Sequence, residues 1–232
     1  TNYLETIMSN ELWLPSTSAT IAYTYRQILD KYALETTGST AGVEYQAHDF
    51  SMRGMAAFEA SPASGAGHLF SFVGTDTIPA INYLEEYYNA NIEKELVATS
   101  ITATEHSVMC AHGETDEFEL FKWLMTDRYP NGFFSVVSDT WDFWKVVAEY
   151  LPRLKDEVMA RDGRVVIRPD SGDPVLILCG DPNAEDELVR KGLIESLYDI
   201  FGGTVTEQGY KVLDPHIGAI YGDSITIERC EQ

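Results

Sequence analysis

Short apolar runs alternate along the chain with longer segments of helical pattern. Each run is rich in β-branched or other apolar residues and ends in a polar cluster, which predicts a strand followed by a loop. The predicted strands are Val43–His48, Leu69–Val73, Ser100–Thr104, Phe134–Val137, Val165–Ile167 and Ile217–Tyr221. Four of the five intervals between their polar ends are about 30 residues, the length of one strand–helix repeat.

The segments between these runs predict helices. In Ile78–Tyr88 the apolar positions recur at spacings of three and four. Thr115 is a predicted N-cap for a helix over Phe118–Arg128, because acidic residues follow it in the first turn. The remaining predicted elements are helices over residues 1–35, over Trp141–Met159 with a break or kink at Pro152, and over Glu185–Phe201, and a hairpin around Tyr210–Leu213.

Strands that alternate with helices favour a parallel sheet in an α/β fold. In a βα barrel the polar ends of successive strands meet at one mouth, whereas an open sheet binds its ligand chiefly at one switch point. Six polar strand ends favour an incomplete βα barrel, with an open doubly wound sheet as the alternative. We expect a helical N-terminal segment over residues 1–40 and the partial barrel over 41–232, both as a piece of a longer protein.

The net charge of the chain argues against two classes of partner. The 232 residues are 44% hydrophobic and 23% charged, and 16 Lys and Arg against 37 Asp and Glu give a formal net charge of −21. Such a surface repels nucleic-acid phosphates and anionic lipid headgroups, so we expect neither nucleic acid nor membrane as a partner. Cys110, Cys179 and Cys230 form no CxxC pair, which fits reduced thiols in a cytoplasmic protein.

The polar clusters at the strand ends carry candidate chemistry. Gly74–Thr77 and Ser138–Asp139 each fit an N-cap for the next helix as well as a substrate contact. His106 fits either a supporting or a reacting histidine. The loop Arg168–Gly172 is more informative, because it offers a cation for phosphate and a carboxylate for hydroxyl groups or a hydrated Mg²⁺.

Together the clusters suit a polyhydroxylated, phosphorylated substrate. We expect carboxylates, arginines and a histidine to ring one cavity: Asp49, Asp76, Asp139, Asp170 and Asp223 with Arg53, Arg168 and His106. No GxGxxG, GxxxxGK(S/T), GxSxG or HExxH motif is present. His112 lies too far from His106 for a helix-borne metal site and is predicted at the surface.

These clusters resemble the nicotinamide phosphoribosyltransferase family of type II phosphoribosyltransferases. The similar segments follow the family's order at near-family spacing: His48–Phe50 with Arg53 and Gly54, Gly74–Thr77, Glu105–Ser107, Ser135–Asp139, Ile167–Gly172 and Tyr221–Asp223. The likeness runs from about Leu12 to the end of the chain. It implies a barrel-like α/β domain with a smaller β-rich domain, in a homodimer whose active sites lie at the subunit interface.

The resemblance implies a reaction between phosphoribosyl pyrophosphate and nicotinamide. The phosphoribosyl group would move to the pyridine nitrogen, giving nicotinamide mononucleotide and pyrophosphate in NAD salvage. Phe50 would stack on the ring, and Asp76 would accept a hydrogen bond from the carboxamide. Arg168 would contact phosphate and also lie against the ring.

The resemblance also assigns the phosphate and ribose contacts. Arg53 and Arg168 would bind phosphate or pyrophosphate, while the ribose would face Asp170, Gly222 and Asp223. His106 matches the histidine that ATP phosphorylates, with Asp139 as its partner carboxylate, so the implied catalytic residues are His106, Asp139 and Asp170. Mg²⁺ is expected with pyrophosphate and without direct ligation by side chains.

Two alternatives stay open. A nicotinate phosphoribosyltransferase shares the architecture, but Asp76 argues against it because a carboxylate repels the carboxylate of nicotinate. A catalytically silent domain that binds pyridine nucleotides is the second. Compared with the family, most of the small N-terminal domain and the glycine-rich 5′-phosphate segment expected after Asp223 are absent, so we expect this piece alone to be inactive. Ser51–Met52 and Met55–Ala60 also differ from the family pattern around Arg53.

Overall fold

A computed structural model describes residues 1–223 and 225–232 of the chain. Its internal contacts divide the chain into two compact units: unit 1 holds Thr1–Ser100 with Glu231, and unit 2 holds Ile101–Cys230 with Gln232. This division falls at residue 100 and not at residue 40, because the N-terminal helix packs within unit 1. The partial barrel over 41–232 stays a prediction.

Unit 1 is mostly helical. Its elements are α1 (Asn2–Thr37), the 3-10 helix η1 (Val43–Tyr45), β1 (His48–Asp49), the 3-10 helix η2 (Ser51–Gly54), α2 (Ala60–Leu69), β2 (Gly74–Thr75) and α3 (Pro79–Tyr88). The helices predicted over residues 1–35 and Ile78–Tyr88 are confirmed as α1 and α3. Although α1 is long, no helix within the described residues has an apolar stretch that could cross a membrane.

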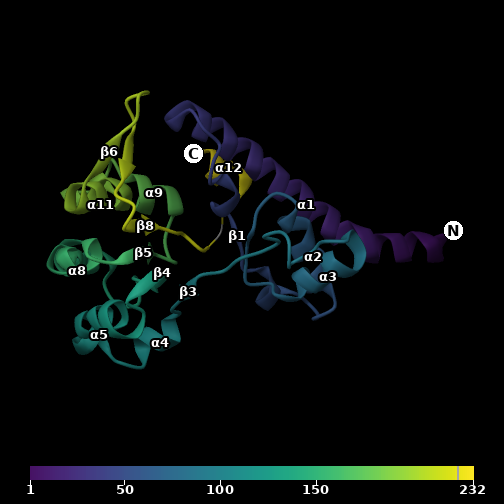
Figure 1. The fold of residues 1–232 in the computed structure, drawn as a ribbon, viewed down its shortest axis with the longest axis horizontal. Helices are drawn as coiled ribbons and strands as arrows, with labels where there is room; N and C mark the ends of the chain where they lie inside the picture. Colours follow the sequence, from purple (N-terminus) through teal and green to yellow (C-terminus); the bar gives the residue numbers. More distant parts are fainter. Residues whose placement is uncertain (224) are drawn as a thin grey trace. The chain divides into compact units, whose positions relative to one another are not determined.

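Small residues in α2 allow the helices of unit 1 to pack closely, as the ribbon in Figure 1 shows for α1 and α2. A Cβ atom on Gly67 would lie 2.7 Å from the backbone oxygen of Pro15 in α1. On Gly65 it would lie 2.8 Å from the Cβ atom of Ala80 in α3. Glycine is therefore required at both positions by the distance between the helices.

Two strands predicted in unit 1 are wrong. Val43–His48 begins as a 3-10 turn after Gly42, whose φ of 87° starts the turn, and only His48–Asp49 is a strand. Leu69–Val73 is the end of α2 and a turn, in which the Phe72 backbone N–H donates to the oxygen of His68. Phe72 is buried and stacks on the His68 ring, so its apolar character reflects packing at a helix end.

Unit 2 is an α/β unit built on a four-stranded parallel sheet. The sheet order is β3-β4-β5-β8, formed by β3 (Thr102–Ala103), β4 (Asn131–Val137), β5 (Asp162–Arg168) and β8 (Ile217–Ala219). The strands predicted at Ser100–Thr104, Phe134–Val137, Val165–Ile167 and Ile217–Tyr221 are thus confirmed with shifted ends. A parallel sheet with helical connections confirms the expected α/β class.

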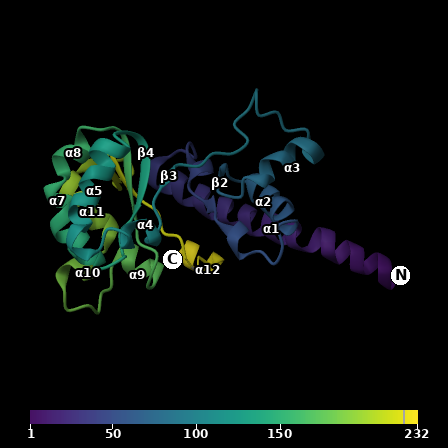
Figure 2. The same ribbon diagram turned by 90° about the horizontal axis from the view of Figure 1, so that it is seen from below.

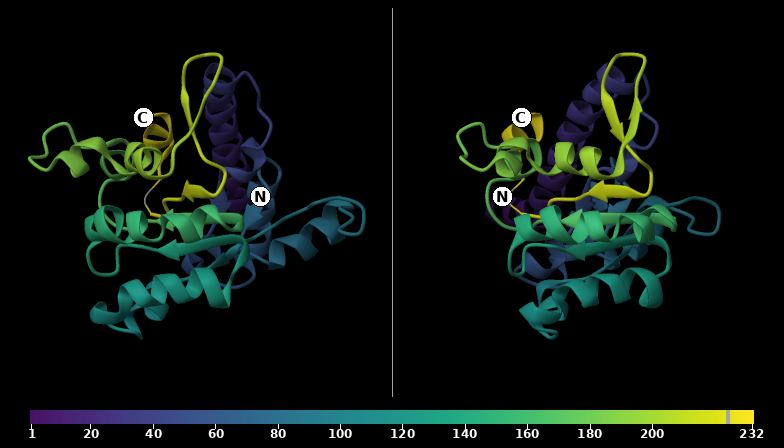
Figure 3. Two further views of the ribbon diagram at one scale, coloured as in Figure 1. Left: turned by 60° about the vertical axis from the view of Figure 1, so that its left-hand side comes forward. Right: turned by 90° about the vertical axis from the view of Figure 1, so that its left-hand side faces the viewer.

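The connections of unit 2 are mostly short helices. They are α4 (His106–Cys110), η3 (Glu114–Asp116), α5 (Glu117–Trp123), η4 (Leu124–Arg128), α6 (Phe143–Lys145), η5 (Val146–Tyr150), α7 (Leu151–Arg153), α8 (Lys155–Met159), α9 (Pro174–Cys179), α10 (Glu187–Lys191), α11 (Leu193–Phe201) and α12 (Ile227–Glu231). The predicted hairpin is confirmed as the antiparallel pair β6 (Gly203–Val205) and β7 (Lys211–Leu213), which Figure 3 shows in yellow-green.

One face of this sheet forms the core of unit 2. Phe134, Val136, Val165, Ile167 and Ile217 alternate along their strands and are at most 1% exposed. They pack on α5, α7, α8 and α11, which lie together beside β4 in Figure 2. The opposite face mixes the apolar Val137 with the polar Ser135 and Arg168, so it is less uniformly apolar than the faces of buried parallel strands usually are.

Three predicted helices differ in detail. Thr115 is not an N-cap, because it lies inside η3 before α5. The helix expected over Trp141–Met159 starts at Phe143 and breaks at Leu154, directly after the turn that contains Pro152. Glu185–Phe201 is split at Gly192, whose φ of 80° a non-glycine residue rarely adopts.

Candidate active site

The C-terminal ends of the unit 2 strands carry a polar cluster. His106 follows β3, Asp139 follows β4, and Asp170 and Ser171 follow β5. Because parallel strands in register bring these ends to the same sheet edge, residues that are more than 30 positions apart become neighbours. We call His106, Asp139, Arg168, Asp170 and Ser171 the β4–β5 cluster.

Asp139 contacts three other members of the β4–β5 cluster. Its Oδ1 lies 3.1 Å from His106 Nε2, and its Oδ2 accepts from the Asp170 backbone N–H at 2.8 Å and from Ser171 Oγ at 2.6 Å. Its side chain is 5% exposed, whereas the His106 side chain is 47% exposed. The carboxylate is therefore fixed by the β5 loop while the histidine ring remains open to solvent.

The environment of Asp139 keeps it ionised. Burial acts to raise the pKa of this carboxyl, but the hydrogen bonds from Ser171, the Asp170 N–H and His106 together lower the pKa below its ordinary value. An ionised carboxylate only accepts hydrogen bonds, so the proton between the two residues lies on His106 Nε2. The other ring nitrogen, Nδ1, carries the lone pair when the ring is neutral.

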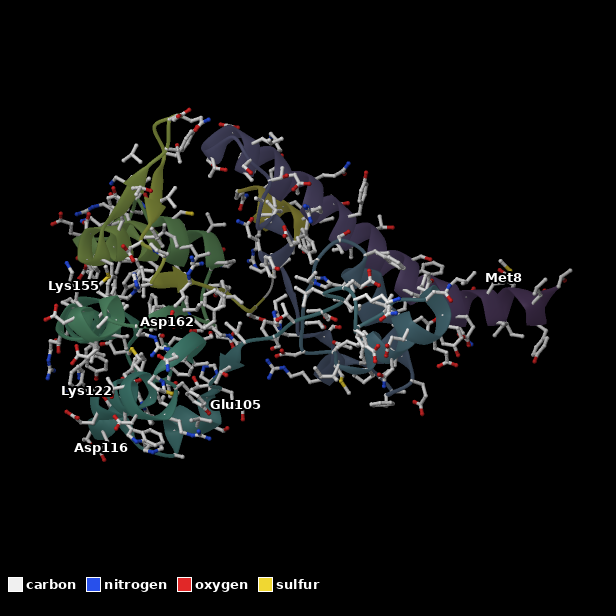
Figure 4. The ribbon with its side chains drawn as sticks, in the orientation of Figure 1. Met8, Glu105, Asp116, Lys122, Lys155 and Asp162 are labelled. Atoms are coloured by element: carbon white, nitrogen blue, oxygen red, sulfur yellow. The ribbon has the colours of Figure 1, made fainter. Side chains whose placement is uncertain are left out.

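The α4 helix begins at His106, directly after the exposed residue Glu105, which Figure 4 labels. The Ser107 hydroxyl donates to the Glu105 carboxylate, so this turn is fixed by its own side chains. His106 thus lies on a locally ordered turn that holds its ring near Asp139.

Arg168 and Asp170 form an ion pair at the end of β5. Arg168 Nη2 lies 3.1 Å from Asp170 Oδ1, and the side chains are 7% and 18% exposed. Gly222 leaves room for this pair: a Cβ atom there would lie 2.7 Å from Asp170 Oδ1 and 2.8 Å from Arg168 Nη2. The backbone at residue 222 therefore lies directly against a buried cation and its carboxylate.

Tyr221 joins the end of β8 to the β5 loop. Its hydroxyl donates to the backbone oxygen of Gly172 at 2.8 Å. Burial raises the pKa of Tyr221, and the carboxylates of Asp223, Asp139, Asp170 and Asp173 raise it further. The phenol therefore stays protonated and can keep donating to Gly172.

Unit 1 holds the remaining candidate residues. Asp76 follows β2, and its Oδ1 lies 2.9 Å from His48 Nε2 and 2.7 Å from Ser100 Oγ. We call His48, Asp76 and Ser100 the Asp76 cluster. Phe50 is close to it, because the ring centroids of Phe50 and His48 are 4.5 Å apart.

Asp49 is the last residue of β1, and Arg53 lies in η2, which follows it. Asp49 Oδ1 accepts from the Ser51 N–H at 2.8 Å, so this carboxylate shapes the start of η2. Arg53 is exposed at the end of η2. That all the candidate residues of both units line one cavity stays a prediction.

The helix-cap interpretations of two polar clusters are wrong. Asp142, not Asp139, caps α6, by accepting from the Lys145 N–H at 3.0 Å. Helix α3 begins with Pro79 and has no side-chain cap, so Asp76 does not serve it either. Both carboxylates are thus available for contacts outside the helices that follow them.

Several contacts of the candidate site were not predicted from the sequence. Ser171, which donates to Asp139, and Tyr221, which donates to the Gly172 backbone oxygen, lie within the similar motifs without an assigned role. Ser100, which donates to Asp76, is only the start of a predicted strand. The type of residue gives no signal in these cases, because serine is common in loops. Strand pairing, which brings Ser100 beside β2, is the information that was missing.

In the described part of the chain, no three His, Cys, Asp or Glu side chains are grouped so as to hold a metal ion. His112 is exposed, as predicted, and its Nδ1 lies 3.3 Å from the backbone oxygen of Val108.

Three curated relatives cover essentially the whole chain, and each is named nicotinamide phosphoribosyltransferase. The protein of Acinetobacter baylyi is 51% identical over 100% of this chain and 46% of its own length. That of Mycoplasma pneumoniae is 40% identical over 99% and 48%, and that of Xanthomonas campestris pv. campestris is 33% identical over 97% and 45%. The chain therefore spans about half the length of the curated relatives it matches.

A family comparison identifies the wider group. The model of the nicotinate phosphoribosyltransferase family matches residues 45–232, which include both the Asp76 cluster and the β4–β5 cluster. Because the match covers well over half of its residues, the chain belongs to the nicotinate phosphoribosyltransferase (NAPRTase) family.

Proposed function

We propose that this chain is part of the catalytic region of a nicotinamide phosphoribosyltransferase. The reaction joins the pyridine nitrogen of nicotinamide to C1 of the ribose while the bond from C1 to pyrophosphate breaks, and pyrophosphate leaves with the electron pair. The observation that carries the proposal is the similarity over essentially the whole chain to proteins named for this activity. The intact β4–β5 cluster supports catalysis over a silent binding role.

The charges of the β4–β5 cluster suit this chemistry. Displacement at an anomeric carbon passes through a state with positive charge on the ribose, which nearby carboxylates stabilise. Asp170 is the carboxylate we assign to the ribose, with Gly222 and Asp223 beside its hydroxyl groups. Arg168, held by Asp170, would neutralise the departing pyrophosphate, and we assign a further phosphate contact to the exposed Arg53.

The His106–Asp139 pair suits phosphoryl transfer from ATP. With the proton on Nε2, the neutral ring presents the Nδ1 lone pair as the nucleophile. Asp139 would stabilise the positive charge that the ring gains on phosphorylation. ATP is thus proposed as a coupling substrate: His106 Nδ1 would bond to the γ-phosphorus while the bond from that phosphorus to the β-phosphate oxygen breaks, and ADP leaves with the electron pair.

Mg²⁺ is proposed to enter with pyrophosphate. The carboxylate oxygens of Asp170 and Asp223 can accept hydrogen bonds from the waters of a hydrated Mg²⁺, so the residues present fit such an ion without ligating it directly. When bound, it would neutralise charge on the leaving group.

We also propose a fold, an oligomeric state and a cellular location for the protein that contains this chain. The four parallel strands keep their chain order across the sheet, which favours a βα barrel over an open sheet whose order reverses. We also propose a cytoplasmic homodimer with its active sites at the subunit interface, as the family resemblance implies.

A second candidate substrate is nicotinate, because the matching family model is named for it. Asp76 argues for nicotinamide. Its carboxylate can accept a hydrogen bond from the carboxamide N–H, and it repels the carboxylate of nicotinate. Nicotinate is therefore the competing substrate against which the selectivity for nicotinamide is measured.

The test uses the full reading frame that contains this chain. The purified protein is incubated with phosphoribosyl pyrophosphate, Mg²⁺ and ATP, and with nicotinamide and nicotinate in competition, and mononucleotide products are separated by mass. Nicotinamide mononucleotide should be the main product. Formation of nicotinate mononucleotide alone would replace the substrate assignment, and absence of both products would refute the activity.

A substitution at Gly222 tests the role of the ion pair. In the Gly222→Ala variant, the new methyl group would displace the Arg168–Asp170 pair, because its Cβ would lie within 3 Å of both side chains. We expect the KM for phosphoribosyl pyrophosphate to rise about tenfold, with a smaller change for nicotinamide. An equal change in both KM values would place Gly222 outside the phosphoribosyl site.

A further inference from the structure

The Asp76 cluster is built by three neighbouring backbone segments of unit 1. Strand β2 pairs with β1 on one side, where His48 is opposite Gly74, and with Thr99 on the other. The Asp76 N–H donates to the Asp49 oxygen at 2.9 Å, and the Thr75 N–H donates to the Thr99 oxygen at 3.0 Å. Asp76 therefore follows the central segment, with His48 on one neighbour and Ser100 on the other.

Both neighbours donate to the same oxygen of Asp76. His48 Nε2 lies 2.9 Å and Ser100 Oγ 2.7 Å from Oδ1. A carboxylate accepts only, so the histidine tautomer with the proton on Nε2 and the serine hydroxyl are the donors. Neither contact uses Oδ2, and the Asp76 side chain is 49% exposed.

His48 is itself held in place. Its side chain is 14% exposed, and its ring contacts the Phe50 ring at a centroid distance of 4.5 Å. Gly74 leaves room for the imidazole, because a Cβ atom there would lie 2.9 Å from His48 Nδ1 and 2.8 Å from the Ala47 oxygen. The donor that faces Asp76 is thus fixed by packing and by backbone.

We propose that His48 and Ser100 are positioning residues that set the preference for a pyridine carboxamide over a pyridine carboxylate. By fixing Oδ1 they fix the rotation of the Asp76 carboxylate, so that Oδ2 faces the carboxamide N–H without reorganisation on binding. This inference rests on the proposed function and concerns the orientation of Asp76.

The test removes each donor and then restores it. In the full-length protein, His48→Leu and Ser100→Ala should each raise the KM for nicotinamide about five- to tenfold, with kcat within about twofold. The ratio of kcat/KM for nicotinamide to that for nicotinate should fall by a similar factor. His48→Gln, which can place an amide N–H near the position of Nε2, and Ser100→Thr should recover most of both losses.

A coupling experiment distinguishes positioning from general damage. In an Asp76→Ser background, His48→Leu and Ser100→Ala should change the selectivity ratio by less than about twofold, because their effect passes through Asp76. His112→Leu, at an exposed histidine outside the cluster, is the matched control and should leave the ratio unchanged. Ser100→Ala removes a single oxygen from an exposed residue, so its result stands even if His48→Leu does not fold.

The outcomes separate this inference from the proposed function. A wild-type protein that forms no nicotinamide mononucleotide refutes the proposed function. A wild-type protein that is active and selective, with unchanged selectivity in His48→Leu and Ser100→Ala, overturns the positioning role alone. Equal losses in the presence and absence of Asp76 overturn it as well, because the two donors would then act independently of that carboxylate.

Discussion

Asp139→Asn should lower the ATP-stimulated kcat/KM of the full-length protein by about 10² to 10⁴-fold, the range expected when a proton-handling group loses its partner. Asn has nearly the shape of Asp, so the β4–β5 cluster should keep its geometry. The loss follows from which atoms donate and which accept. It does not require any change in packing.

The amide that replaces the Asp139 carboxylate would be unable to satisfy all the donors around it. In the wild type, Oδ2 accepts from the Asp170 N–H and from Ser171 Oγ. If the amide oxygen keeps that place, its NH₂ group faces His106 Nε2, which must then be the acceptor. The imidazole proton would move to Nδ1, and the lone pair that we propose to accept the phosphoryl group would be lost.

Three measurements check this prediction. The rate with and without ATP should become nearly equal in the variant, phosphohistidine should be undetectable by phosphorus NMR, and the nitrogen shifts of His106 should report the proton on Nδ1. Asp142→Asn is the control, because Asp142 is an exposed helix cap and Asn caps as well as Asp. A variant that retains full ATP stimulation would remove Asp139 from the proposed mechanism.

The stability that Asp139 contributes to the β4–β5 cluster should fall as the pH is lowered. Hydrogen bonds hold the pKa of Asp139 below its ordinary value of about 4. The carboxylate therefore stabilises the folded cluster fully at pH values above its ordinary pKa. This stabilisation is lost as the pH falls through the lowered pKa of the folded state. Asp139→Asn should abolish this particular loss on the acid side.

Sequence patterns predicted unit 2 better than unit 1 for a physical reason. Strands β4 and β5 place buried apolar residues on one face, and Val137 and Val166 add apolar residues on the other, which gives each strand a short apolar run. In unit 1 the strands have only two residues each, too few for any periodicity. The apolar run Leu69–Val73 instead reflects the packing of a helix end.

The candidate residues at the strand ends were named from the sequence, but the side chains that contact them were not. Asp139 and His106 stood at separate strand ends, and their contact at 3.1 Å follows from the pairing of β3 with β4. The donors His48, Ser100 and Ser171 around Asp76 and Asp139 depend on strand pairing and on the β5 loop, which leave no periodic pattern in the sequence. Contacts of this kind need coordinates, since residue type alone does not distinguish them from ordinary turn residues.

Asp76→Ser should lower the preference for nicotinamide over nicotinate by about a hundredfold in kcat/KM. A hydrogen bond to a charged group contributes about 1.5–3 kcal/mol, and each 1.4 kcal/mol corresponds to a factor of ten. The serine hydroxyl is neutral and can donate to a carboxylate. The substitution therefore weakens the contact with the carboxamide and removes the repulsion of nicotinate.

The measurement is a competition between the two pyridines at equal concentration, with both mononucleotides quantified in one reaction. Asp127→Ser, which changes an exposed carboxylate in η4, controls for the loss of one negative charge and should leave the product ratio as in the wild type. His48 and Ser100 remain in the variant, and their donors would then face a hydroxyl oxygen, so a substrate carboxylate gains two further neighbours that can donate to it. For this reason the change should appear chiefly as a lower KM for nicotinate, and an unchanged product ratio would show that another group reads the carboxamide.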